Sequence, residues 1–262
     1  MENEQVFIAD LFKGKRALIT GGGTGIGFAI AELLGSLGAH VIIAARTVEK
    51  LENATQQLRE KNIKVDYLPV NIRDETEVEE LFKKIFSKWE TLDFLINNAG
   101  GQFAAPAKEI SHGGFRAVVD LNLQGTWHMS STFAKKLIVK GSEGRIINIV
   151  LCLKSGMPGM VHAAAARAGV MNMTKTLAYE WGSQGITVNT IAPGTIQTDG
   201  LEQYDEKHLQ KSIEELPINR MGTANEVAHA VAYLLSPAGS YFTGTTLEID
   251  GGEHLLGARS QL

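Results

Sequence analysis

The chain has 262 residues, 44% of them hydrophobic and 21% charged, which is typical of a globular protein with a sizeable core in one α/β domain or two small ones. The formal net charge of −4 argues against a nucleic-acid partner. No apolar run is long enough to span a membrane, which argues against a membrane partner. The seven histidines are scattered, which argues against a metal site. The single cysteine, Cys152, excludes an intramolecular disulfide and favours a reducing compartment, so we expect a cytoplasmic protein.

Short, nearly continuous apolar stretches alternate with helical patterns, which is typical of a parallel sheet covered by helices on both faces. The predicted strands are Arg16–Thr20, His40–Ala45, Val65–Val70, Phe94–Asn97, Arg145–Val150, Thr187–Ala192 and Thr245–Ile249. The predicted helices are Phe28–Leu37, Glu49–Lys61, Glu75–Trp89, a long stretch over about 112–139, Ala163–Gly182, Asp205–Leu216 and Asn225–Leu235. Because no linker, repeat or low-complexity segment interrupts this order, the pattern predicts a single α/β domain over residues 1–262, with a doubly wound sheet of about seven strands.

A glycine-rich turn joins the first strand to the first helix. Its sequence, Thr20–Gly27, has the spacing T-G-x-x-x-G-x-G. In a strand–turn–helix context such glycines let backbone N–H groups approach a dinucleotide pyrophosphate, and the helix N-terminus faces its negative charge. The turn therefore predicts a dinucleotide site, although a glycine-rich hairpin turn is the alternative. The dinucleotide-binding half would cover about 14–150.

The end of the second strand distinguishes the two nicotinamide cofactors. An NAD-binding chain usually places a carboxylate about 20 residues after the glycines to bind the ribose 2′-hydroxyl. This chain has Ala45 followed by Arg46. Because a guanidinium can bind a 2′-phosphate through two parallel hydrogen bonds, the residues favour NADP(H) over NAD(H). The alternative is that Arg46 is only a solvated residue at a helix start.

Residues 195–218 follow the end of the sixth strand and lack regular periodicity apart from the short helix. Loops after the carboxyl ends of parallel strands commonly cover ligands. We therefore expect this segment to act as a lid over a substrate.

Four motifs in order, Thr20–Gly27, Asn97–Gly100, Asn122 and Pro193-Gly194, resemble the short-chain dehydrogenase/reductase family over nearly the whole chain. The resemblance implies a Rossmann-like fold, a nicotinamide cofactor, a small-molecule substrate and commonly a homotetramer formed by the helices around 112–139 and 163–182 and the last strand. We expect the apolar stripe of the second of these helices, formed by Val170, Met173, Leu177 and Trp181, to contribute to that interface. The cofactor residues implied by the resemblance or by the motifs above are Gly21, Thr24, Gly25, Ile26, Gly27, Arg46, Asn71, Ile72, Asn98, Ala99, Gly100, Arg167, Pro193, Gly194, Ile196 and Thr198.

The acid–base residues of that family are replaced in this chain. The family's Tyr-x-x-x-Lys motif falls on Ala163 and Arg167, and Val150-Leu151 stand where its catalytic serine is expected. Asn122 matches the asparagine that holds a water and a helix bend in the family. Arg167 remains a cation that can donate to the cofactor ribose, but reduction of a carbonyl needs a donor at the forming alkoxide.

One branch of the family tolerates this loss. Gly101-Gln102-Phe103 and Val161-His162 resemble the peroxisomal trans-2-enoyl-CoA reductases, which are related to 2,4-dienoyl-CoA reductases. The tyrosine and serine of the dienoyl enzymes fall on Cys152 and Ala163. Enoyl reduction puts hydride on Cβ and builds charge on the thioester oxygen, so it needs an oxyanion site and a source for the Cα proton.

The resemblance therefore implies an NADPH-dependent enoyl-CoA reductase with Asn122, Arg167 and His162 as catalytic candidates. Histidine titrates in the useful pH range, and Cys152, Lys154 and Ser155 are further candidate donors nearby. Two alternatives stay open: a nucleotide-binding protein that has lost catalysis, and a reductase of an unidentified carbonyl substrate.

Overall fold

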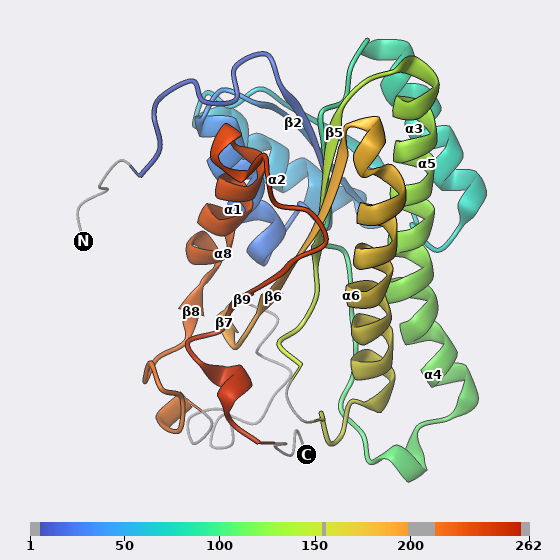
Figure 1. Cartoon of the computed structure of the whole chain (residues 1–262), viewed down its shortest axis with the longest axis vertical. Helices are drawn as coiled ribbons and strands as arrows, with labels where there is room; N and C mark the ends of the chain where they lie inside the picture. The colour runs from blue at the N-terminus through green and yellow to red at the C-terminus, as the bar shows by residue number, and fades with distance from the viewer. Residues whose placement is uncertain (1–5, 154–155, 199–212, 258–262) are drawn as a thin grey trace.

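A computed structural model describes residues 6–153, 156–198 and 213–257. It contains a parallel sheet of seven strands in the order β3-β2-β1-β4-β5-β6-β9, which confirms the predicted fold class (Figure 1). The strands are β1 (Arg16–Thr20), β2 (His40–Ala45), β3 (Val65–Pro69), β4 (Phe94–Asn97), β5 (Gly144–Ile149), β6 (Ile186–Pro193) and β9 (Thr246–Ile249). A second, two-stranded sheet pairs β7 (Ile196–Gln197) with β8 (Gly222–Thr223).

Helices cover both faces of the sheet. The α-helices are α1 (Gly25–Ser36), α2 (Val48–Glu60), α3 (Glu75–Lys88), α4 (His112–Val119), α5 (Gly125–Lys140), α6 (Val161–Trp181) and α8 (Ala224–Leu235). Alternate residues of β1 point to opposite faces: Ile19 packs with α1, α2 and α8, and Leu18 packs with α3, α5 and α6. Each face thus has its own apolar core, and the two helix layers lie on opposite sides of the sheet in Figure 1.

The long helix predicted over about 112–139 is divided in two. A π-helical turn, Asp120–Gln124, separates α4 from α5. Within this turn the Asn122 Nδ2 donates to the backbone oxygen of Val118 at 2.7 Å. A side-chain amide that competes for helix carbonyls favours such a bulge, which accounts for the bend expected at this residue.

The apolar stripe of α6 covers the core of the domain. Val170 and Leu177 are buried against the sheet, and Met173 and Trp181 are half-buried against the same apolar clusters. Val170 and Leu177 therefore cannot contribute to an oligomer interface, because α6 needs them to pack onto the sheet, whereas an interface role of Met173 and Trp181 stays a prediction.

Residues 199–212 of the predicted lid, which include 205–212 of the helix expected over Asp205–Leu216, lie outside the described residues. Within the described ranges, no helix is both long enough and apolar enough to cross a bilayer.

Candidate active site

A cleft of about 590 Å³ opens at the carboxyl ends of the central strands. The chain runs from β1 outward to β2 and β3 and then returns to β4 on the other side of β1, so the loops after β1 and β4 diverge there. Such a switch point is where open α/β sheets bind ligands. The predicted cofactor residues that line the cleft are Gly21, Thr24, Gly25, Ile26, Arg46, Asn71, Ile72, Asn98, Ala99, Gly100, Arg167 and Thr198.

Four other predicted cofactor residues lie outside this lining. A Cβ at Gly27 would overlap the carbonyl oxygen of Gly21, so Gly27 lets α1 pack closely against the turn. Pro193 ends β6 beside Ile249 of β9. Gly194 and Ile196 follow it, and Ile196 is buried in the core. Contact of these residues with a cofactor stays a prediction.

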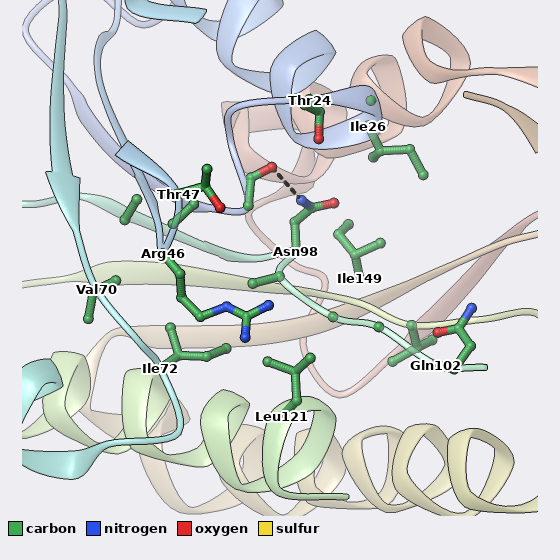
Figure 2. Close-up of a pocket in the computed structure, with 18 of the residues that line it drawn as sticks. Thr24, Ile26, Arg46, Thr47, Val70, Ile72, Asn98, Gln102, Leu121 and Ile149 are labelled. Atoms are coloured by element: carbon green, nitrogen blue, oxygen red, sulfur yellow. Dashed lines mark hydrogen bonds between the residues drawn. The ribbon is translucent and has the colours of Figure 1, made fainter. Parts of the chain in front are cut away.

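The glycine turn is fixed by the loop after β4. Asn98 Nδ2 donates to the backbone oxygens of Thr20 and Gly21 at 3.0 and 3.2 Å. Figure 2 draws one hydrogen bond of this amide as a dashed line. The backbone N–H groups of Asn98 and Ala99 both donate to Thr20 Oγ1 at 3.0 Å. These bonds hold the two loops that border the cleft in one arrangement.

The N-terminus of α1 presents backbone donors to the cleft. Thr24 is the N-cap residue, but its side chain makes no capping hydrogen bond. Gly21 and Gly25 have φ of +66° and +53°, which a side chain would strain. The first-turn N–H groups of α1 are therefore available for an anion such as a pyrophosphate.

The cleft has a positive electrostatic character. Its described lining contains two guanidinium groups, Arg46 and Arg167, and no carboxylate. Arg46 follows β2, is exposed, and extends into the cleft in Figure 2. Arg167 comes from α6 and is only 5% exposed.

Arg167 is a buried cation with few partners. Its Nη1 donates to the backbone oxygen of Ile149 at 2.9 Å, and its Nε has no hydrogen-bond partner. Burial lowers the pKa of Arg167 to about 10. A Cβ at Gly100 would overlap Arg167 Nη2 and would lie 2.7 Å from Asn122 Oδ1, so glycine at this position lets the three residues meet.

Asn122 positions the loop after β4. Its Oδ1 accepts from the N–H of Gly101 at 3.2 Å, and its Nδ2 donates to the oxygen of the same residue at 2.8 Å. Asn122 is fully buried, does not line the cleft, and has both amide atoms engaged. Its side chain therefore holds protein backbone in place.

His162 lies at the start of α6 and is fully buried outside the cleft lining. Its Nδ1 accepts from the N–H of Ala163 at 2.7 Å, which assigns the proton of the neutral ring to Nε2. Nε2 has no hydrogen-bond partner, and the ring packs edge-on against Phe103 with the centroids 4.5 Å apart. Burial lowers the pKa of His162, so the ring is a neutral donor at neutral pH.

Apolar side chains surround the position of the family's tyrosine. Ala163 is fully buried with Val118 and Met160, and Leu151 and Met157 pack on the same cluster. Cys152 is also buried and donates its thiol to Asp250 Oδ2 at 3.1 Å. The other candidate donors, Lys154 and Ser155, lie outside the described residues.

Sequence reasoning missed part of the lining. Thr47, Val70, Gly101, Gln102, Ile149, Val150 and Leu151 belong to it, as do Ala44, Ala45 and Leu121. All but Leu121 lie at or just after the end of a strand. Because ligands of such sheets bind at the carboxyl ends of the strands, inspection of every predicted strand end would have found these residues. Leu121 belongs to the π-helical turn and had no sequence signal.

Comparison with known proteins gives consistent matches. The family described as enoyl-(acyl carrier protein) reductase matches residues 21–254. A probable 2,4-dienoyl-CoA reductase, (2E)-enoyl-CoA-producing, from Bacillus subtilis (strain 168) is 37% identical over 246 residues, covering 92% of this chain and 97% of the relative. A 3-oxoacyl-(acyl-carrier-protein) reductase from Rickettsia conorii is 39% identical over 240 residues, covering 91% of this chain and 96% of the relative. The crystal structure of a short chain dehydrogenase from Bacillus anthracis has a TM-score of 0.89 and 40% identity, covering 94% of this chain and 98% of that one.

Proposed function

The chain belongs to the short-chain dehydrogenase/reductase family, and from this premise we propose that it is an NADPH-dependent reductase of the double bond of an enoyl-CoA. The observation that carries the cofactor proposal is the cleft with two guanidinium groups and no described carboxylate. A phosphorylated dinucleotide carries several negative charges, which this lining would attract without repulsion.

The cleft residues suit different parts of that cofactor. The free N–H groups of α1 suit the pyrophosphate, and Arg46 suits the 2′-phosphate. Arg167, held next to Gly100 and Asn122, suits the hydroxyl groups of the nicotinamide ribose. The bound cofactor would supply hydride.

The apolar surroundings of Ala163 support reduction of a carbon–carbon double bond. Carbonyl reduction needs a proton donor at the new alkoxide, and Val118 and Met160 pack at the position where the family's tyrosine would provide it. Enoyl reduction needs only stabilisation of the enolate oxygen and a proton at Cα. Solvent would supply that proton, because His162 is buried outside the cleft lining, and the dienoyl-CoA reductase relative supports an acyl-CoA substrate.

The test is NADPH oxidation by the unmodified protein, saturated with NADPH, with crotonyl-CoA and with a longer enoyl-CoA. We expect turnover of at least one. We also expect Ala163→Tyr to give little gain in enoyl reduction, because an alkoxide donor is not what that reaction lacks. Absence of enoyl turnover together with new carbonyl reduction by Ala163→Tyr would identify the chain as a disabled dehydrogenase.

Two other functions compete with this one. The 39% identical 3-oxoacyl reductase favours a carbonyl substrate, which acetoacetyl-CoA tests in the same assay. A protein that only binds nucleotide would bind NADPH in titration calorimetry and turn over none of these compounds.

We further propose that the chain forms a homotetramer and acts in the cytoplasm, with 195–218 as its lid. The exposed Phe115 of α4 and Trp127 of α5 support self-association, because large apolar side chains exposed on helices are typical of interfaces. Light scattering should give four copies, and Trp127→Glu should lower that number. A monomer at micromolar concentration would contradict the assembly proposal.

A further inference from the structure

The end of the cleft near Arg167 has few polar side chains. Gly100, Gly101 and Leu121 gather there around Arg167 and Ile149, and Gln102 continues the same loop. Figure 2 shows Gln102 and Arg46 at opposite sides of the cleft. Of Gly100, Gly101, Gln102, Leu121 and Ile149, which lie around Arg167 at this end of the lining, Gln102 alone has a polar side chain.

The segment that carries Gln102 is fixed on both sides. Asn122 binds both backbone polar atoms of Gly101, directly before Gln102. Further along, the N–H of Ala105 donates to the backbone oxygen of Gly159 at 2.9 Å. A donor on a segment held in this way needs little reorganisation when charge develops beside it.

Other candidate donors near this end are already engaged. The Asn122 amide bonds to Gly101 and Val118, and the Cys152 thiol donates to Asp250. Asn98 Nδ2 bonds to the backbone of the glycine turn. The Gln102 amide has no hydrogen bond to another described residue and is half-buried in the cleft wall.

We propose that Gln102 is a catalytic residue that donates its side-chain N–H to the thioester oxygen of the substrate. The inference rests on the proposed function and deepens it. A bound reduced cofactor would supply a hydride to Cβ; the electron pair of the double bond would then move into the Cα–carbonyl unit, and the oxygen would gain negative charge. The Gln102 amide stabilises that oxygen by a hydrogen bond and transfers no proton. Solvent would then protonate Cα, which gives the saturated thioester; the cofactor would already be oxidised through the loss of its hydride.

A neutral amide explains how the chain can reduce an enoyl thioester without the family's tyrosine. The enolate oxygen needs a hydrogen-bond donor, whereas an alkoxide needs a proton. The apolar cluster around Ala163 and the amide of Gln102 therefore have complementary consequences: the first disfavours carbonyl reduction, and the second favours enoyl reduction.

The first experiment compares Gln102→Leu with Gln57→Leu, the same change on the exposed face of α2. We expect Gln102→Leu to lower kcat/KM for crotonyl-CoA by about 100-fold, the typical cost of one oxyanion donor, with an unchanged Kd for NADPH. Gln57→Leu should change neither. The unchanged Kd for NADPH also shows that the variant is folded. A parent enzyme that turns over crotonyl-CoA while Gln102→Leu stays within threefold of it overturns the proposal.

The second experiment uses Gln102→Glu and a pH profile. A carboxylate beside the enolate repels it, whereas the protonated acid can donate. We expect the activity of this variant, relative to the parent, to rise as the pH falls through the carboxyl pKa. A ratio independent of pH would indicate that residue 102 does not face the developing charge and would overturn the proposal.

The affinity for crotonyl-CoA tests the Gln102 proposal independently of the proposed reductase activity. Crotonyl-CoA is titrated calorimetrically into the parent and into Gln102→Leu, each saturated with NADP⁺ so that no reduction occurs. Loss of one hydrogen bond should weaken binding by about fivefold. If the parent fails to turn over but shows this difference, the reductase proposal fails and the Gln102 contact with the thioester stands. If the parent neither binds nor reduces crotonyl-CoA, or binds it as well as the variant does, the Gln102 proposal fails.

Discussion

The two arginines of the cleft have the same side chain in opposite surroundings. Arg46 is exposed at the end of β2, and solvent can hydrate its guanidinium when no ligand is bound. Arg167 is enclosed between Gly100, Asn122 and the backbone oxygen of Ile149. An exposed cation such as Arg46 can select a ligand at little cost in folding free energy. An enclosed cation such as Arg167 is held in a fixed position, but its burial destabilises the cofactor-free protein.

The pKa of Arg167 gives the sign of that cost. Burial lowers the pKa of this group from its ordinary value to about 10, so between pH 10 and the ordinary pKa the folded protein binds fewer protons than the unfolded chain. Stability contributed by this group therefore rises with pH through that window, and the full burial cost is present at neutral pH. By the usual conversion of pKa differences the cost is about 3 kcal/mol.

The largest expected effect comes from removing the buried cation. Arg167→Ala should lower kcat/KM for enoyl-CoA by about 100-fold, or about 2.7 kcal/mol, because the ribose and the bound geometry are loosened. Arg167→Met should have a similar effect on activity while raising the free energy of unfolding of the cofactor-free protein by about 1–3 kcal/mol. Steady-state kinetics and urea unfolding measure the two quantities.

Arg145→Met is the matched control for that prediction. Arg145 is half-buried, and its Nη1 donates to the backbone oxygens of Leu234 and Ser236 near the end of α8. Its removal should destabilise the protein and leave NADPH affinity unchanged. If Arg167→Met and Arg145→Met destabilise the cofactor-free protein equally, burial of Arg167 does not carry the cost that we infer.

A smaller effect is expected at the exposed cation. The parent should bind NADPH at least about tenfold tighter than NADH, or about 1.4 kcal/mol, and Arg46→Ala should remove most of that preference. Because Arg46 is exposed, the preference should also fall with added salt. Titration calorimetry at two salt concentrations measures it, and equal affinities for both cofactors in the parent would exclude the assignment of Arg46 to the 2′-phosphate.

The smallest effect is expected at an exposed arginine that is already paired. Arg220 binds Glu226 through two bonds, at 2.7 and 3.0 Å, and Glu226 also completes the capping box of α8 with Thr223. Hydrogen bonds from Arg220 and then from the backbone of Thr223 lower the pKa of Glu226 to about 2. Because this pKa is lowered, the stability that the carboxylate contributes is present above 4.5 and is lost as the pH falls toward 2.

Glu226→Gln tests this contribution. At pH 7 it should cost no more than about 1 kcal/mol, since solvent screens an exposed pair, and it should leave NADPH affinity unchanged. Near pH 3 the parent and the variant should differ less in Tm than at pH 7. A larger difference in Tm at the lower pH would show that the stability contributed by the Glu226 carboxylate does not fall with pH, and would contradict the prediction.

The sequence by itself determined the strands, the glycine turn and Arg46 at the end of β2, because apolar alternation and turn chemistry depend on neighbouring residues. Only the tertiary structure decided that Val170 and Leu177 belong to the core, since a stripe of apolar residues looks the same whether a sheet or a second subunit covers it. Only the tertiary structure showed that the Asn122 amide binds Gly101, because the two residues are 21 positions apart in the chain. The fixed position of the neighbouring Gln102 follows from that contact. Burial of Arg167 likewise depends on Gly100 and Asn122 from other segments, because a guanidinium is enclosed only where distant parts of the chain meet.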